Sequence, residues 1–150
     1  MVSVDTLKKL DIFDGLPVSE LKVIADISDV ESCPRGTMAF SENREAKKLY
    51  VLLEGKVVIQ FEVGRHQDAV VHTVAPGQAF GWSALVQPHK FTASAKCTED
   101  CKLLTVDREG LRRLLEEDCR TGFIIMEKLA EIISMRLRDT RLQLISMIHG

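Results

Sequence analysis

The sequence has few cysteines, prolines and aromatic residues, and it contains no long apolar run. Of its 150 residues, 4 are Cys, 4 are Pro, 1 is Trp and 1 is Tyr. The cysteines form no C-x-x-C pair, which argues against a disulfide framework or a zinc ribbon and predicts reduced, mostly buried thiols. No run approaches ~18 apolar residues, and Asp5, Lys8 and Lys9 stand where a signal peptide would be apolar. We therefore expect a cytoplasmic protein that does not enter a membrane.

Neither sign of charge dominates. The chain has 20 basic and 22 acidic side chains, which leaves a formal net charge of -2. The broad electropositive surface of a nucleic-acid-binding protein is therefore missing, and we expect no direct DNA binding. Charged residues make up 28% and hydrophobic residues 45% of the chain, as in globular proteins rather than disordered or collagen-like ones. We predict a single domain, residues 1–150, that buries about 68 to 70% of its unfolded surface.

The middle of the chain, residues 30–106, has the pattern of an all-β sandwich or barrel. Short apolar runs are separated by glycines and polar clusters. In chain order the runs are 37–40, 49–53, 56–63, 69–74, 92–97 and 102–106. Glu54-Gly55 and Gly64 are the predicted hairpin turns, because glycine adopts the positive φ that tight turns demand. Residues 1–29 are predicted to form small packing helices.

After Asp107 the spacing of apolar residues becomes helical, so residues 107–150 are predicted to be helices. Asp107 is predicted to cap a helix that ends near Glu117, and a second helix is predicted from Gly122 to Ile148. Roughly 27 residues at 1.5 Å each span ~40 Å, which exceeds the width of a small barrel. Apolar positions recur along it in steps of three and four, at Phe123, Met126, Ala130, Ile133, Leu137, Thr140, Leu144 and Met147.

The two halves of this long helix differ in pattern. A second apolar row, Ile125, Leu129 and Ile132, widens the apolar face in the first half only, so that half is predicted to pack on the barrel. The second half has a narrower seam with charged flanks, which predicts a coiled-coil-like homodimer contact. The residues predicted at this contact are Leu137, Thr140, Leu144 and Met147. The alternative is a helix that lies wholly on its own barrel.

The order of these elements, together with three short motifs, resembles a known family. The motifs are Pro34-Arg35-Gly36, the run 49–57 (LYVLLEGKV) and the glycine-bounded segment that starts at Phe80-Gly81. They are similar to the cyclic-nucleotide-binding domain of the catabolite activator and fumarate-nitrate regulator family. The resemblance implies a mainly β fold with flanking helices, namely a double-stranded β-helix (a jelly-roll-like β-roll) with a long C-terminal dimerisation helix. It also implies a non-catalytic regulatory domain. No DNA-binding domain is expected, because the chain ends where the family's helix-turn-helix would begin.

The phosphate-binding cassette departs from the family pattern at two positions. In the family it begins Phe-Gly-Glu and closes with Arg-Thr-Ala or Arg-Ser-Ala. Here Trp82 stands at the position of the ribose-binding glutamate, and Phe91 at that of the phosphate-binding arginine. Removing one partner of a buried charge pair costs ~2 to 5 kcal/mol, whereas a helix N-terminus contributes only ~0.3 to 2 kcal/mol. We therefore expect weak or absent binding of cyclic AMP and cyclic GMP.

The rest of the cassette still predicts a ligand site. Its candidate residues are Gly81, Trp82, Ser83, Ala84, Leu85, Lys90, Phe91 and Thr92, joined by Thr140 and Arg141 at the positions of the family's base contacts. Lys90 is the nearby cation that could replace the arginine, although on an extended segment it points to the opposite face from Phe91. Trp82 and Phe91 either line a pocket for a nucleotide-like or other small ligand, or plug a vestigial one.

Other chemistries have weaker support. His66, His72 and His89 would suit a barrel-bound metal, but they form no H-x-H pair and have no glutamate partner, so no metal site is predicted. Cys97 and Cys101 lack a third ligand and are predicted to be structural. No catalytic motif is present, so we expect neither an enzyme nor a firmly bound cofactor. Two hypotheses follow: a dimeric sensor of a small-molecule effector, and a ligand-independent dimeric module that binds a partner protein.

Overall fold

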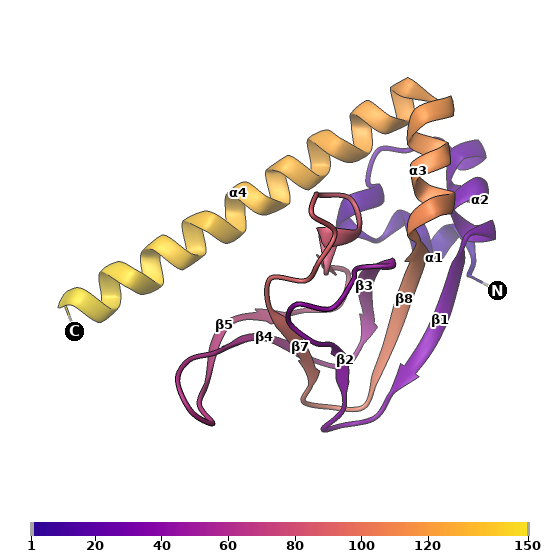
Figure 1. Ribbon diagram of the computed structural model, residues 1–150. Helices are drawn as coiled ribbons and strands as arrows, with labels where there is room; N and C mark the ends of the chain where they lie inside the picture. The colour runs from indigo at the N-terminus through magenta and orange to yellow at the C-terminus, as the bar shows by residue number, and fades with distance from the viewer. Residues whose placement is uncertain (1, 150) are drawn as a thin grey trace.

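Two four-stranded antiparallel sheets form the β-roll of the computed structural model, which describes residues 2–149 (Figure 1). One sheet has the order β1-β8-β3-β6, with β1 (Ser28–Cys33), β8 (Cys101–Asp107), β3 (Lys48–Glu54) and β6 (Ala79–Phe80). The other has the order β2-β7-β4-β5, with β2 (Met38–Phe40), β7 (Ser94–Cys97), β4 (Val57–Glu62) and β5 (Asp68–Val74). The predicted mainly β fold with flanking helices is confirmed.

The sequence pattern located six of these strands and missed two. β1 has the polar sequence SDVESC, yet it pairs with β8 from Ser28↔Val106 to Cys33↔Cys101. The boundary predicted at residue 30 was therefore wrong, because β1 begins at Ser28. β6 has only two residues, and it pairs with β3 through Tyr50↔Phe80 and Val51↔Ala79. Pairing with a neighbouring strand, rather than local pattern, makes both segments strands.

The helices lie at one end of the roll and along its side (Figure 1). α1 (Val4–Lys8), the 3₁₀ turn η1 (Asp11–Phe13), α2 (Val18–Asp26) and α3 (Arg108–Glu117) gather at that end, from which α4 (Cys119–His149) extends past β5. As predicted, Asp107 caps α3, since its Oδ2 accepts a hydrogen bond of 2.8 Å from the Gly110 amide. α4 begins three residues before the predicted start, because Asp118 accepts from the Thr121 amide at 3.1 Å. Its 31 residues span about 46 Å.

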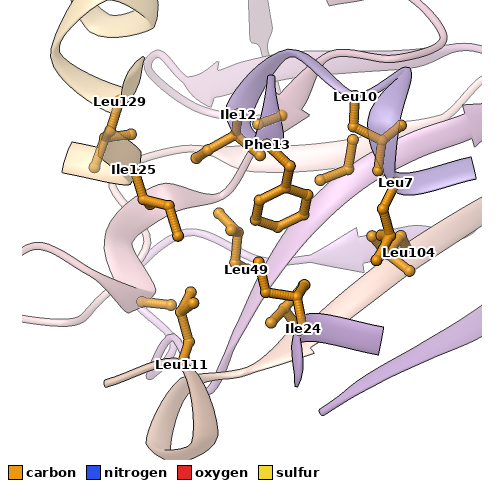
Figure 2. Packing of buried hydrophobic residues seen from close by; sticks show 14 of the residues in the cluster. Leu7, Leu10, Ile12, Phe13, Ile24, Leu49, Leu104, Leu111, Ile125 and Leu129 are labelled. Atoms are coloured by element: carbon orange, nitrogen blue, oxygen red, sulfur yellow. The ribbon is translucent and has the colours of Figure 1, made fainter. Parts of the chain in front are cut away.

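The first half of α4 is anchored in the hydrophobic core, as predicted. Figure 2 shows Phe13 of η1 with Ile125 and Leu129 of α4 on one side and Leu7 and Leu104 on the other. Phe13 is 1% exposed, Ile125 is fully buried and Leu129 is 2% exposed. The burial of these large side chains holds α4 against η1 and α3, so the start of the helix is fixed relative to the β-roll.

The row of apolar residues that includes Phe123 and Met126 faces away from the core. These side chains are 66% and 41% exposed, and Leu137, Leu144 and Met147 further along the same row are also exposed. The expectation that the two apolar rows form one wider stripe in the first half is therefore wrong for Phe123 and Met126. One row is buried, whereas the other is exposed except at positions such as Ile133, which is half-buried and packs against the core. Within residues 2–149 no helix is both long and apolar enough to cross a membrane.

Candidate functional site

The cassette begins at Gly81, whose backbone has a left-handed conformation and which lies close to aromatic rings. Gly81 links β6 to the 3₁₀ turn η2 (Trp82–Ala84) and has φ of 67°. A Cβ atom at this position would lie 2.7 Å from Cε2 of Phe40 and 3.1 Å from Cδ2 of Tyr50. Both the positive φ and the close approach of the two rings require glycine here. The turn therefore lies directly on the aromatic residues of the roll.

The closing segment of the cassette is tied to residues 43–46 by backbone hydrogen bonds. The Phe91 amide donates to the Arg44 carbonyl at 2.9 Å, and the Asn43 amide donates to the Phe91 carbonyl at 2.8 Å. Two residues from this contact on each segment, the Ala46 amide donates to the His89 carbonyl at 2.7 Å. These bonds fix Phe91 so that its side chain enters the roll, where it is 5% exposed.

Phe91 completes a cluster of four aromatic rings. It stacks on Phe40 with the ring centroids 3.7 Å apart and the planes 9° from parallel. Phe40 also lies 5.2 Å from Tyr50 and 5.9 Å from Phe80, centroid to centroid, and Tyr50 lies 5.5 Å from Phe80. Burial raises the pKa of the Tyr50 phenol. The cluster occupies the inner part of the pocket, where a charged phosphate would have to displace packed rings.

A small hollow of about 70 Å³ remains between the cassette and α4. Five of the predicted site residues line it, namely Gly81, Trp82, Ser83, Phe91 and Thr92. Its other lining residues are Phe40, Ile59, Phe80, Ala93 and Arg136. Pockets for drug-sized ligands measure roughly 300 to 1,000 Å³, so the space left is far smaller than a nucleotide requires.

The other predicted site residues lie elsewhere. Ala84 is buried, and with Leu85 it lines a separate hollow that faces α3. Lys90 is exposed, its backbone pairs with Glu45 as an isolated β-bridge, and it is not among the residues that line the hollow beside Phe91. Thr140 and Arg141 are exposed on α4, and the Thr140 hydroxyl donates to the Arg136 carbonyl of its own helix at 2.9 Å. The structure does not bring these five residues to the hollow.

Arg136 lines the hollow but was not among the candidate residues chosen from the sequence. From α4 its Nη2 donates to the Ala79 carbonyl at 2.9 Å, and its Cζ lies 5.2 Å from the centroid of the half-buried Trp82 ring. A cation over an aromatic face is attracted by the ring quadrupole. In the sequence, Arg136 is one of the charged residues that flank the predicted seam, and it was expected to lie in solvent. The curvature of the roll instead places the cassette, more than 50 residues earlier in the chain, under this side chain. Arg136 thus joins α4 to the cassette.

Two further ionisable groups lie close to Arg136. Asp11 of η1 accepts a hydrogen bond from the Ala79 amide at 3.1 Å through Oδ1, and burial raises the pKa of this carboxyl although Arg136 opposes the change. His72 of β5 has a buried Nε2 without a hydrogen-bond partner among the described residues. Burial, and secondarily Arg136, lowers the pKa of His72. The pKa of each group is thus influenced by Arg136 of α4.

The cysteines are not among the residues that line the hollow. Cys33, Cys97 and Cys101 are buried free thiols and Cys119 is an exposed one, as predicted. Burial, with smaller contributions from Cys33 and Cys101, raises the pKa of Cys97 far above its ordinary value. In residues 2–149 no group of three or more His, Cys, Asp or Glu side chains is placed to hold a metal ion.

The two-sheet roll, the glycine-led cassette turn and the long C-terminal helix together define a regulatory ligand-binding fold. Comparison with protein families assigns residues 30–118 to the cyclic nucleotide-binding domain, so the chain belongs to this family. A Geobacter metallireducens protein described as cyclic nucleotide-binding has a solved structure with a TM-score of 0.82 and 33% identity, which covers 91% of this chain and 99% of that one. The resemblance inferred from the sequence is confirmed.

The chain is also similar to two curated bacterial regulators. It is 25% identical over 144 residues to the CRP-like cAMP-activated global transcriptional regulator of Mycobacterium tuberculosis, covering 96% of this chain and 62% of that protein. It is 27% identical over 139 residues to the cyclic AMP receptor protein of Thermus thermophilus, covering 92% of this chain and 62% of that protein. The chain thus spans somewhat less than two thirds of the length of these relatives. The first is described as a transcriptional regulator and the second as a receptor protein.

Proposed function

We propose that this chain is a non-catalytic regulatory domain that responds to an effector smaller than a cyclic nucleotide and works as a homodimer. The observation that carries the proposal is the Phe40–Phe91 stack, with centroids 3.7 Å apart, at the place that the family resemblance gives to the phosphate-binding arginine. Only about 70 Å³ remains beside it. The site is closed to a nucleotide, but a small effector can reach its polar lining residues Ser83, Thr92 and Arg136.

Energetics support the exclusion of cyclic AMP and cyclic GMP. A buried phosphate without its arginine loses ~2 to 5 kcal/mol, and a helical turn as short as η2 contributes only a fraction of that. A nucleotide would also have to separate Phe91 from Phe40, which costs the apolar burial of both rings. The exposed Lys90 offers no compensating charge. Affinities near micromolar would weaken by at least ~30-fold, since each 1.4 kcal/mol is a factor of ten.

The open apolar row of α4 supports the homodimer. Leu137, Leu144 and Met147 are 49%, 57% and 80% exposed, on a helix that projects beyond the β-roll (Figure 1). Apolar residues spaced three and four apart on an exposed helix are typical of coiled-coil seams. Phe123 and Met126 extend the row toward the start of the helix. Two copies that pair α4 with α4 would cover this row on both chains.

Arg136 provides a route from the site to the dimer contact. It holds the cassette carbonyl of Ala79 and the Trp82 ring from α4, only one residue before Leu137 of the open row. An effector that changes these contacts changes the position of α4, and the change reaches a partner protein through that helix. A ligand shifts such an equilibrium only by its differential affinity for the two positions.

A second candidate is a ligand-independent interaction module. The observation that favours it is that Arg136 already bridges α4 and the cassette while the aromatic cluster closes the inner pocket. In that case the β-roll only supports α4, and the dimer binds its partner protein without an effector.

A thermal-shift screen separates the two candidates. Cyclic mononucleotides, cyclic dinucleotides and small metabolites are tested in turn, because selective binding to the native state raises the unfolding midpoint. The sensor proposal expects a small metabolite at about 100 times its Kd to raise the midpoint by roughly 5 to 10 °C. It expects cyclic AMP and cyclic GMP to leave the midpoint unchanged. A midpoint that no small metabolite raises supports the interaction module.

A further inference from the structure

Arg136 lines the hollow with most of its hydrogen-bonding capacity unused. A guanidinium group has five N–H donors, and the structure gives Arg136 one hydrogen bond, to the Ala79 carbonyl. Its side chain forms no ion pair within the part of the chain that the structure describes. Burial lowers its pKa, which shows that the charge is partly removed from water. The cation is therefore partly desolvated and not directly ion-paired, an arrangement that a bound anion would stabilise.

The charged and titratable groups near Arg136 do not supply that anion. Asp11, on η1, directs Oδ1 to the Ala79 amide and raises the pKa of Arg136 through space, against the effect of burial, but it forms no ion pair with Arg136 among the described residues. Asp139, one turn further along α4, is exposed, and solvent screens its charge. His72, on β5, has a lowered pKa and is neutral near pH 7. Among the described residues, Arg136 therefore has no directly paired carboxylate beside the hollow.

The size and lining of the hollow define what fits there. Its volume of about 70 Å³ exceeds the ~10 to 15 Å³ needed by one water, so it holds a group of about four or five heavy atoms. Phe40 and Phe91 give it an apolar wall, whereas its other lining residues include Ser83 and Thr92, which carry hydroxyl groups, and Arg136. An inorganic anion such as phosphate is polar on every side and would leave oxygens unpaired against the rings.

We propose that this hollow binds a short-chain carboxylate, with its carboxylate paired to Arg136 and its aliphatic end against Phe40 and Phe91. Arginine binds a carboxylate through two parallel hydrogen bonds, and this geometry matches the unused donors. The proposal deepens the proposed function and rests on it, because it names the class of the small effector. The bound carboxylate shares the guanidinium with the Ala79 carbonyl and the Trp82 ring, and so changes the link between α4 and the cassette.

The test is a fluorescence titration with sodium propionate at constant ionic strength. Trp82 is the only tryptophan of the chain, and Arg136 lies over its ring, so binding changes its emission. Ligand-observed saturation-transfer NMR on propionate provides a second readout that does not depend on Trp82. A five-atom ligand is expected to bind with a Kd of about 1 mM. Propionamide has the same shape without the charge and is expected to give no response.

Two arginine variants test the contact. Arg136→Met is expected to weaken propionate binding at least tenfold, whereas Arg138→Met, two residues along the same helix at an exposed position, is expected to bind like the wild type. Should Arg136→Met not fold, Thr92→Val removes a hydroxyl at an exposed position and is expected to weaken binding about fivefold. Circular dichroism verifies that each variant is folded.

Several results would overturn the inference. The first is an equal response to propionamide. The second is unchanged propionate binding in Arg136→Met or, if that variant is unfolded, in Thr92→Val. The third is the absence of a response in both readouts up to about 100 mM propionate. Cyclic AMP, titrated in parallel, separates this inference from the proposed function. Tight binding of cyclic AMP contradicts the proposed function, whereas failure of propionate alone contradicts only the carboxylate site.

Discussion

Phe91 belongs to the hydrophobic core as much as to the pocket. Its ring is 5% exposed and stacked on Phe40, and the backbone on both of its sides is bonded to residues 43 and 44. An arginine at this position would present a charge to the interior in the absence of a phosphate, whereas a phenyl ring stabilises the closed form. At this single residue, stability of the empty domain and affinity for a phosphate oppose each other.

Phe91→Ala is therefore expected to lower the free energy of unfolding by ~3 to 5 kcal/mol, as large-to-small changes in cores do. Urea denaturation followed by circular dichroism measures it. The control is Val63→Ala, at a side chain that is 48% exposed near the β4–β5 hairpin, where a change within about 0.5 kcal/mol is expected. Equal, small losses in the two variants would show that the ring is not packed as described.

His72 is expected to make stability depend on pH. Because its folded-state pKa lies below the ordinary 6.5, the unfolded chain binds more protons as pH falls below that value, and the free energy of unfolding decreases. His72→Gln should reduce this slope between pH 7 and 5, whereas His66→Gln, at the exposed hairpin, should not. The raised pKa of Asp11 acts in the opposite direction and is common to all the proteins compared. Equal slopes in wild type and His72→Gln would contradict the burial of this ring.

At the scale of elements, the cassette turn depends on a glycine for two separable reasons. Gly81 and Gly64 have φ of 67° and 69°, but their surroundings differ. A Cβ atom added at Gly81 would lie 2.7 Å from the Phe40 ring, whereas one added at Gly64 would have nothing within 4 Å. Gly64→Ala is expected to cost about 1 to 2 kcal/mol, for the backbone conformation alone. Gly81→Ala is expected to cost a further ~1 to 3 kcal/mol, because Phe40 must move within a packed cluster.

Thermal unfolding of the two glycine variants, side by side, measures that difference. Since the backbone cost is shared, the excess loss in Gly81→Ala reports the contact with Phe40 alone. Identical losses of stability in the two variants would mean that the aromatic rings rearrange at no cost in free energy. The pocket would then open more easily than its packing indicates.

The sequence was sufficient for elements with strong periodic patterns and insufficient for those defined by tertiary contact. Alternation and glycine turns located six strands, and the spacing of Ile125 and Leu129 located the buried face of α4. β1 is polar and β6 has two residues, so only their pairing partners make them strands. In the site, the cassette residues were found by motif. Arg136 was not found, because no local signal distinguishes an arginine that folds back over Trp82 from a solvated one.

At the scale of the molecule, α4 carries an apolar row that its own β-roll leaves uncovered. We expect a homodimer, and Leu144→Glu is expected to give a folded monomer in analytical ultracentrifugation at tens of micromolar. Gln143→Glu adds the same charge one residue earlier, on another face of the helix, and is expected to remain dimeric. A wild-type protein that sediments as a monomer at this concentration would contradict the dimer.

The central claim is that a member of the cyclic nucleotide-binding family has filled its pocket with its own aromatic side chains. Isothermal titration calorimetry with cyclic AMP and the wild-type protein tests this claim most directly. Because Phe91 and Phe40 occupy the inner pocket and Lys90 is turned to solvent, the account predicts a Kd weaker than about 30 μM. A Kd tighter than that value would contradict it, because it would require the stacked rings to separate for a nucleotide.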